Sequence, residues 1–248
     1  MEQQFSSLNS VMEPETIPKN GASSKSLMSR NFFKQTFFAL LNVLAGTFML
    51  FAFTVCVGGN SGSGGKSAKI KMTIEKDKLW FELGGSGTAT VDWGDGSEKV
   101  TRTLNSNPRF EHSYPSSTIR TILINGDNIT GLDCFDYQLT GLDVSKNTEL
   151  KRLVVAQNQL TSLDVSKNTV LECLVVFRNQ LTSLDVSKNT ELTRLECGDN
   201  QLTSLDVSKN TALKLLTCRG NQFISLDVSK NTALTELDYD YNKVKLIK

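Results

Sequence analysis

Few side chains in this sequence have the type and spacing that catalysis or metal binding requires. His112 is the only histidine, so it is the one imidazole available for acid–base chemistry, and no nucleophile is fixed beside it in the sequence. The five cysteines form no CxxC spacing of the kind that thiolate zinc sites use. Asp92, Asp95 and Glu98 carry suitable oxygens for calcium, but their spacing fits no EF-hand loop. We therefore expect no catalytic residue, no metal site, no cofactor and no enzyme activity.

The charge balance argues against nucleic acid as a partner. The formal net charge is +1 over 248 residues, so no strong overall field would attract a phosphate backbone. Gly65-Lys66-Ser67 ends like a nucleotide-binding loop, but Asn60 stands where that motif needs its first glycine. Residues 58–67, GGNSGSGGKS, are instead expected to be a flexible Gly/Ser linker.

A long apolar segment near the amino terminus indicates contact with a membrane. Residues 37–57 read FFALLNVLAGTFMLFAFTVCV, with Asn42 as the one strongly polar side chain. About twenty such residues are enough to cross the hydrocarbon core as a helix. Arg30 and Lys34 place positive charge on the amino-terminal side, so we expect the rest of the chain to lie outside the cytoplasm.

Two routes of membrane attachment fit this segment. Counted from Met28, residues 28–57 resemble a bacterial signal peptide and would also serve as a transmembrane anchor. Residues 1–27 are then a disordered extension or the product of a misassigned start. Cys56 resembles the acylated cysteine of a bacterial lipoprotein, although such signals place a small residue before it and Val55 stands there. Lipid anchor, single-span anchor and a cysteine without chemical role remain the three alternatives.

Residues 68–125 have the pattern of a small all-β module. Apolar residues alternate in KIKMTIEK, KLWFEL and TATVDW, and Gly- and Asn-rich breaks separate these runs. This is typical of short strands in a sandwich. Trp93-Gly94-Asp95-Gly96 indicates a strand followed by an Asp-Gly turn. Together with Glu111-His112-Ser113-Tyr114 it resembles the PKD domain, an immunoglobulin-like β-sandwich of extracellular proteins, and the resemblance implies that both motifs are structural.

The remaining residues, 126–248, are repetitive. The heptapeptide LDVSKNT returns every 21 residues, and a fixed period near twenty indicates stacked coils. It begins at Leu142, Leu163, Leu184, Leu205 and Leu226. The intervening segments follow LxxLxVxxNxL, first seen complete from Leu150 to Leu160 and traceable back to Ile129. The pattern resembles leucine-rich repeats. Because it occurs twice in each period, it resembles a nested 21-residue class, which implies extended backbone on both long sides of each coil.

The repeat separates inward from outward residues. One coil buries too little apolar surface to offset the entropy of ordering its backbone, so the apolar positions must stack from coil to coil. Cys134, Cys197 and Cys218 share an inward position and are expected to be core residues, with a Cys197–Cys218 disulfide as the minority alternative. Cys173 falls between core positions and is expected to be a partly exposed thiol. Asparagine amides are expected to bond backbone groups between coils, and these residues are Asn158, Asn179, Asn200, Asn221 and Asn242.

A partner would contact the outward residues, which vary between coils. We expect the ligand-binding face on the LxxLxV strands, with Phe177 and Tyr241 as aromatic candidates for hot spots. Its residues are Arg152, Val154, Glu172, Val175, Phe177, Arg178, Arg194, Glu196, Asp199, Thr217, Arg219, Asp238 and Tyr241. A purely solvated face is the alternative. The opposite side repeats a row of Asp and a row of Lys, beginning at Asp143 and Lys146, which we interpret as a device for solubility and register.

The sequence thus predicts a mainly β protein with one N-terminal hydrophobic helix, a small PKD-like β-sandwich and a leucine-rich repeat solenoid. It resembles leucine-rich repeat proteins of bacterial surfaces. The resemblance implies a non-catalytic adhesion or interaction protein, anchored in the membrane and exposed outside the cytoplasm, with an unidentified protein as its partner. A structural envelope spacer and a carbohydrate-binding accessory module, which would take a glycan, are the alternatives. Val244 and Ile247 begin a further half-coil, which leaves truncation and dimerisation at that end both open.

Overall fold

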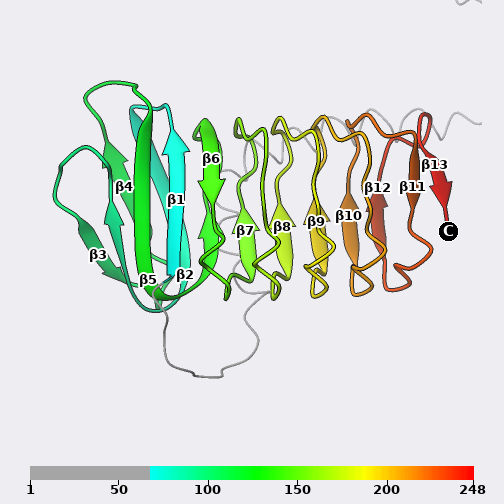
Figure 1. Ribbon diagram of the computed structural model, residues 1–248, viewed down its shortest axis with the longest axis horizontal. Helices are drawn as coiled ribbons and strands as arrows, with labels where there is room; N and C mark the ends of the chain where they lie inside the picture. Colours follow the sequence, from blue (N-terminus) through cyan, green and yellow to red (C-terminus); the bar gives the residue numbers. More distant parts are fainter. Residues whose placement is uncertain (1–67) are drawn as a thin grey trace, which may run out of the picture. The chain divides into compact units, whose positions relative to one another are not determined.

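A computed structural model describes residues 68–248, and these residues form strands and turns without a helix. They belong to one compact unit, and most of their strands stand side by side (Figure 1). The N-terminal extension, the apolar segment, Cys56 and the linker lie outside the described residues. Within residues 68–248 no helix has the length and apolar character that crossing a membrane requires.

The first six strands pair with one another in antiparallel fashion. They are β1 (Ala68–Ile74), β2 (Lys78–Asp92), β3 (Val100–Thr103), β4 (Arg109–Ser113), β5 (Arg120–Asp133) and β6 (Leu139–Asp143). β2 pairs with β3, β4 and β5, while β1 lies between β5 and β6. The alternating residues face the core as their period of two predicts, and Ile70, Phe81 and Val91 are fully buried.

β2 and β5 are longer than the short strands that the sequence pattern predicted, with 15 and 14 residues. The Gly-rich segment of β2 is a bulge rather than a break, because the pairing with β5 shifts register between Gly84 and Gly85. Gly85 has a φ of 146°, and a Cβ there would lie 2.0 Å from the carbonyl oxygen of Asn128. Only glycine fits this position, so the strand bends and continues. The expectation of a strand break was wrong here.

β5 belongs to the β module and to the repeats at once. Its amino-terminal part pairs with β1, and its last three residues pair in parallel with β7 (Arg152–Val154), the first strand of the regular repeats. The expected boundary between residues 125 and 126 therefore falls inside one strand. β2 continues along the other edge of β5 as far as the Glu82–Asp133 pair, and β1 covers the edge of β6. The antiparallel strands β2 and β1 thus flank the first coil and shield its inward residues.

The repeats wind as coils with two long sides. On one side, called the strand side below, β5 is followed by parallel strands that repeat every coil: β7, β8 (Cys173–Val175), β9 (Arg194–Glu196), β10 (Leu215–Thr217) and β12 (Glu236–Asp238). The inward residue at the centre of each is a leucine, and these stack as Leu132, Leu153, Leu174, Leu195, Leu216 and Leu237. All but Leu237 are fully buried, so they form one continuous apolar column.

The other long side carries the LDVSKNT segments and is called the LDV side below. Its strands are β6 at the first coil and the parallel pair β11 (Ser225–Asp227) and β13 (Lys245–Ile247) at the last coils. Between them the described backbone has tight turns but neither helix nor strand. The LDV side is therefore held together by contacts other than a continuous hydrogen-bonded ladder.

The expected asparagine ladder follows the end of each strand on the strand side. Asn158 donates from Nδ2 to the Cys134 carbonyl of the preceding coil at 2.9 Å and accepts the Leu139 amide at 3.0 Å. Asn179, Asn200 and Asn221 make the equivalent bonds. Asn242 differs, because it is exposed in the last coil. Four of the five asparagines thus have the geometry of a coil-to-coil ladder.

A second asparagine ladder runs along the LDV side, where the sequence analysis did not assign one. All of these asparagines except the first, Asn147, donate to two carbonyls of the preceding coil; Asn189, for example, donates to Val165 at 3.0 Å and to Asn168 at 2.8 Å. The ladder consists of Asn147, Asn168, Asn189, Asn210 and Asn231, all of them buried. These bonds take the place of the missing strand ladder on the LDV side, because each coil there is tied to the previous one through side-chain amides.

Three of the cysteines occupy the inward position that the repeat predicted. Cys134, Cys197 and Cys218 are fully buried, and all three are free thiols. Burial raises the pKa of the Cys218 thiol to about 12. Thiols that stay protonated are poor nucleophiles, so these cysteines behave as small apolar core residues.

Candidate ligand-binding face

The strand side presents its outward residues in rows that contain one residue from each coil. Because the strands pair in strict register, Asp133 of β5 is followed along one row by Val154, Val175, Glu196, Thr217 and Asp238. Glu82 of β2 lies opposite Asp133 and extends this row onto the β module. The candidate face is therefore one continuous surface across β2, β5 and the repeats.

A second hydrophobic cluster lies on this outward surface, separate from the core. We call it the apolar patch, and it consists of Phe135, Val154, Ala156, Cys173, Val175 and Phe177. The four smaller side chains are buried, and the two phenylalanines pack against them while remaining partly exposed. Its members come from the first three coils, and the outward positions that they occupy include charged residues further along the solenoid, such as Arg194, Glu196 and Arg219.

The two aromatic rings of the patch contact each other across a coil. Phe135 and Phe177 have ring centroids 6.4 Å apart at an interplanar angle of 61°, an edge-to-face arrangement. The coil between them carries Ala156 at the corresponding position, and its methyl group is fully buried. The rings can meet because the residue between them is small.

Several residues expected to be displayed on this face are buried. Arg152, Val154 and Val175 have outward positions, but they are only 8, 8 and 6% exposed. Cys173 was expected to be a partly exposed thiol and is fully buried, so that expectation was wrong. The reason is lateral packing, because side chains at the same register on neighbouring coils lie close together and cover one another.

Most charged residues of the face form ion pairs with neighbours on the same face. Lys151 contacts Glu172 at 3.1 Å, and Arg194 contacts Glu196. Two further pairs, Arg178 with Asp199 and Arg219 with Asp238, both measure 3.4 Å. These pairs are exposed or partly exposed and contribute little to stability. They do leave little unpaired charge around the apolar patch.

One ion pair of the face is buried. Arg152 Nη2 lies 3.5 Å from Asp133 Oδ2, with both side chains at least nine-tenths buried, and Arg152 Nη1 donates to Cys173 Sγ at 3.4 Å. Burial raises the pKa of Asp133, and the Arg152 guanidinium opposes that shift. Burial and the nearby Asp133 also raise the pKa of Glu82. This cluster joins the β module to the repeats at the edge of the apolar patch.

A repeated backbone conformation exposes the residues just beyond each strand. Asp136, Gln157, Arg178 and Asp199 all have φ between 51° and 62°, and the equivalent position in the next coil is Gly220. This left-handed turn directs the chain away from the sheet and leaves Arg178 and Asp199 exposed. Tyr241 occupies the same register in the last coil and is 59% exposed, but it lies three coils beyond Phe177. The two predicted aromatic hot spots are thus in different parts of the face.

The WGDG and HxY motifs come together in the β module. His112 Nε2 lies 2.7 Å from Asp95 Oδ2, and its ring stacks on Trp93 with centroids 4.8 Å apart. The Tyr114 hydroxyl donates to the Trp93 carbonyl at 3.0 Å. Bonds from the Ser97 side chain and from His112 hold the pKa of Asp95 well below its usual range. The side chains fix one another, as expected for a structural arrangement. Within the described part of the chain, no group of three or more His, Cys, Asp or Glu residues could hold a metal ion.

Comparison with known proteins gives partial similarities. No family model and no curated protein matches the chain. Among solved structures, it is similar to the functional domain of InlJ from Listeria monocytogenes, which includes a cysteine ladder, with 43% identity over 46% of this chain and 27% of that one, and a TM-score of 0.43. It is also similar to the LRR ectodomain of the receptor kinase SOBIR1 from Arabidopsis thaliana, with 20% identity over 55% of this chain and 79% of that one, and a TM-score of 0.45. An internalin, inlF, from Listeria monocytogenes shows 21% identity over 42% of this chain and 38% of that one, with a TM-score of 0.31.

This chain spans about a quarter of the length of the InlJ structure that it matches. The architecture of this chain follows from its stacked inward leucines and its coil-to-coil asparagine bonds. The repeats form a leucine-rich-repeat-like β solenoid. Its outward face includes three patch residues that the sequence analysis did not assign to the face: Phe135, Ala156 and Cys173. The register of the repeats points to Phe135, because it precedes Phe177 by two periods, but the first coil departs from the repeat pattern and hides this signal.

Proposed function

We propose that this chain is a non-catalytic protein-binding protein of the bacterial cell surface, and that the apolar patch is the centre of its binding face. The observation that carries the proposal is the position of this second hydrophobic cluster, which lies outside the core of the solenoid. Partly exposed rings at its centre and ion pairs around it correspond to the apolar core and polar rim of protein interfaces. Adhesion to proteins of another cell is the role that suits such a displayed surface.

The chemistry of the patch favours a protein over a glycan. Its six side chains are aliphatic, aromatic or thiol groups, so it offers few donors or acceptors to sugar hydroxyls. Charges near it are largely paired with one another, and a highly charged ligand would have to disrupt these pairs. An apolar side chain from a partner protein could pack beside the rings of Phe135 and Phe177 without such a cost. A spacer without a partner would have no need of this patch.

Display at the cell surface rests on the amino-terminal sequence. Residues 28–57 would act as a signal peptide or as a transmembrane anchor, and Cys56 would carry the lipid if the signal is cleaved before it. Mass spectrometry of the mature protein separates these routes, because an acylated amino-terminal Cys56 means a lipid anchor and an intact apolar segment means a single-span anchor. A mature protein that starts elsewhere and carries no apolar segment or lipid would refute anchoring.

Binding can be tested with the full chain, purified in detergent and immobilised on beads. The probes are intact epithelial cells and intact bacteria, each used untreated, after protease treatment or after glycosidase treatment. We expect saturable capture that protease abolishes and glycosidase leaves unchanged. Capture that only glycosidase abolishes would favour the carbohydrate-binding alternative, and no capture of any probe would favour the spacer.

Two variants connect capture to the patch. Phe177→Ser removes a ring at its centre and is expected to weaken capture at least about tenfold, as for an aromatic hot spot. Ile119→Ser is the matched control, because Ile119 is an apolar residue of the β module that is 70% exposed and lies outside the patch. Equal capture by both variants and the unchanged chain would exclude the patch as the binding centre.

A further inference from the structure

The outward row of the strand side contains one carboxylate that differs from the others. The others each contact an arginine, and they are Asp133, Glu196 and Asp238. Within residues 68–248, the Glu82 side chain takes part in no ion pair and no hydrogen bond, although it is only partly exposed. The β2 end of the row therefore carries a negative charge that no contact with another described residue compensates.

A second carboxylate lies beside Glu82 and is also short of donors. Asp133 is directly opposite Glu82 in the β2–β5 pair, and side chains at such positions are about 5 Å apart. Asp133 is more than nine-tenths buried; its Oδ2 lies 3.5 Å from Arg152, whereas its Oδ1 has no hydrogen-bond partner among the described residues. Burial and the nearby Asp133 raise the pKa of Glu82. Two adjacent carboxylates thus share the contact of a single guanidinium.

The two arginines that act on Glu82 are held by other groups. Arg109 lies opposite Glu82 in the β2–β4 pair. Its guanidinium contacts Glu111 at 3.5 Å and lies over the Trp80 ring, 4.1 Å from the centroid. Arg152, on the other side, contacts the carboxylate opposite Glu82. Both arginines therefore reduce the repulsion between the carboxylates without contacting Glu82 itself.

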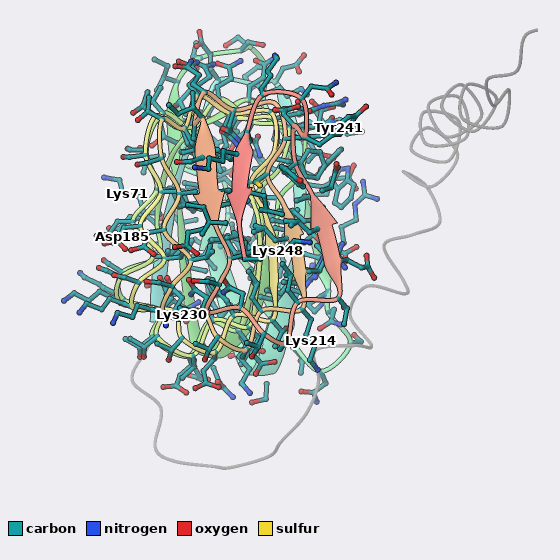
Figure 2. All side chains as sticks on the ribbon, turned by 90° about the vertical axis from the view of Figure 1, so that its right-hand side faces the viewer. Lys71, Asp185, Lys214, Lys230, Tyr241 and Lys248 are labelled. Atoms are coloured by element: carbon teal, nitrogen blue, oxygen red, sulfur yellow. The ribbon has the colours of Figure 1, made fainter. Side chains whose placement is uncertain are left out.

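A partner centred on the apolar patch would also cover Glu82. In the outward row Glu82 is two strands from Val154, a patch residue, and neighbouring strands lie about 4.8 Å apart. A standard interface buries about 800 Å² on each partner, an area roughly 30 Å across. Figure 2 shows that the strand side, with Tyr241, faces away from the LDV side, with Asp185, so the partner meets this row by itself. Removing water from a carboxylate that gains no partner is costly.

We propose that the partner carries a basic side chain, lysine or arginine, which pairs with Glu82 while an apolar side chain of the same partner packs on Phe135 and Phe177. The inference rests on the proposed function, because it names the chemistry of the partner at the same face. The cation supplies the charge that the Glu82–Asp133 pair lacks and replaces the water that the partner displaces. Glu82 is about 10 Å from the near edge of the patch, so one short segment can provide both groups.

The test uses a phage-displayed library of random peptides, selected on the full chain in detergent. Peptides that fail to bind the Phe177→Ser variant contact the patch, and their affinities are measured as synthetic peptides by fluorescence anisotropy. Each is expected to contain Lys or Arg close to an aromatic or aliphatic residue. Glu82→Gln should weaken their binding at least about tenfold. Glu191→Gln, at an exposed glutamate that is not part of the face, is the matched control and should have no effect.

A double-mutant cycle distinguishes direct pairing from an effect of the substitution on the fold. Replacing the basic residue of a peptide with norleucine should weaken binding to the unchanged chain at least about tenfold. The same replacement should weaken binding to the Glu82→Gln variant by less than about twofold, because the carboxylate that the base contacts is already gone. If Glu82→Gln acted only through the fold, the norleucine loss would be equal on the two chains.

The outcomes separate this proposal from the proposed function. Peptides that need Phe177 but bind equally well without the Glu82 carboxylate, or without any basic residue, would overturn the basic anchor and leave the patch as the binding centre. Equal norleucine losses on the two chains would overturn it as well. If no selected peptide depends on Phe177, the patch is not a binding centre and both proposals fail.

Discussion

Phe135 and Phe177 belong to the first and third coils of the solenoid, yet their ring centroids lie 6.4 Å apart. Their contact spans the coil that carries Ala156, whose methyl group leaves the space in which the rings approach. The proposed binding centre therefore depends on a small residue between two large ones, and changing that residue should change the patch without touching the core.

Replacing Ala156 with leucine should force the rings apart. Ala156 is fully buried, so three additional carbon atoms overpack the patch and are expected to cost about 1–3 kcal/mol of the free energy of unfolding. Urea denaturation measures this cost. Ala233→Leu is the control, because Ala233 is exposed and its change should stay within about 0.5 kcal/mol. Equal costs for the two variants would mean that the Phe135–Phe177 contact does not constrain the coil between them.

Removing one member of the LDV-side asparagine ladder should strongly destabilise the solenoid. Asn189→Ala leaves the Val165 and Asn168 carbonyls without their side-chain donor, and each loss is expected to cost about 1–2 kcal/mol. Asn242→Ala, at an exposed position, should cost less than about 0.5 kcal/mol. Chemical denaturation of both variants provides the measurement, and a small loss for Asn189→Ala would show that water or neighbouring groups satisfy those carbonyls.

Arg152→Ala should destabilise the junction in a pH-dependent way. It leaves Asp133 buried without the guanidinium, which is expected to cost about 3–5 kcal/mol at pH 7. Burial raises the folded-state pKa of Asp133, so its ionisation opposes folding and any penalty grows as the pH rises above the unfolded value near 4. The loss should thus be smaller at pH 4 than at pH 7. Replacing both Asp133 and Arg152 with leucine should recover part of the lost stability. If the loss is equal at pH 4 and pH 7 and the double variant recovers nothing, the buried charge is not the cause.

The aspartates of the LDV side should make the solenoid sensitive to acid. In each repeat the Asp side chain accepts the amide of the Ser two residues later, at 2.8 Å for Asp206, and this bond lowers the pKa of the carboxyl. A lowered folded-state pKa gives stability that is present above the unfolded value near 4 and is lost as the pH falls through the folded value.

Two substitutions of Asp206 test this mechanism. Asp206→Asn keeps a neutral acceptor for the amide, so the urea midpoint should fall less between pH 5 and pH 2.5 than in the unchanged chain. Asp206→Ala removes the acceptor and should lower the midpoint throughout that range. Identical acid profiles for the Asn variant and the unchanged chain would show that this carboxyl does not contribute to acid sensitivity.

Gly85 should tolerate no side chain. A Cβ at this position would lie 2.0 Å from the Asn128 carbonyl oxygen, so Gly85→Ala must displace the β2–β5 bulge and should cost more than about 2 kcal/mol. Gly96 also has positive φ, at 82°, but nothing lies within 4 Å of its would-be Cβ. Gly96→Ala should therefore cost only about 1 kcal/mol. Thermal unfolding of the two variants compares steric clash with conformational strain, and equal losses would mean that the bulge adapts.

The sequence by itself determined the coil. A spacing of 21 residues, with apolar positions held constant, specifies which side chains stack inward, because every coil must bury the same positions against its neighbours. It also indicated the strand-side asparagines and the variable outward rows. Val175 and Phe177 were assigned to the face in this way, and both are part of the apolar patch.

Only the tertiary structure decided how the outward residues pack and how the two modules join. Burial of Arg152 and Cys173 depends on neighbours one coil away, and the role of Phe135 depends on the space above Ala156. The period of the sequence gives the register of such contacts but not whether adjacent side chains fill the space between them. At the junction, a glycine-rich segment is equally compatible with a turn and with a bulge. The pairing of β2 with β5, and of β5 with β7, is what makes one strand continue where the sequence suggested a boundary.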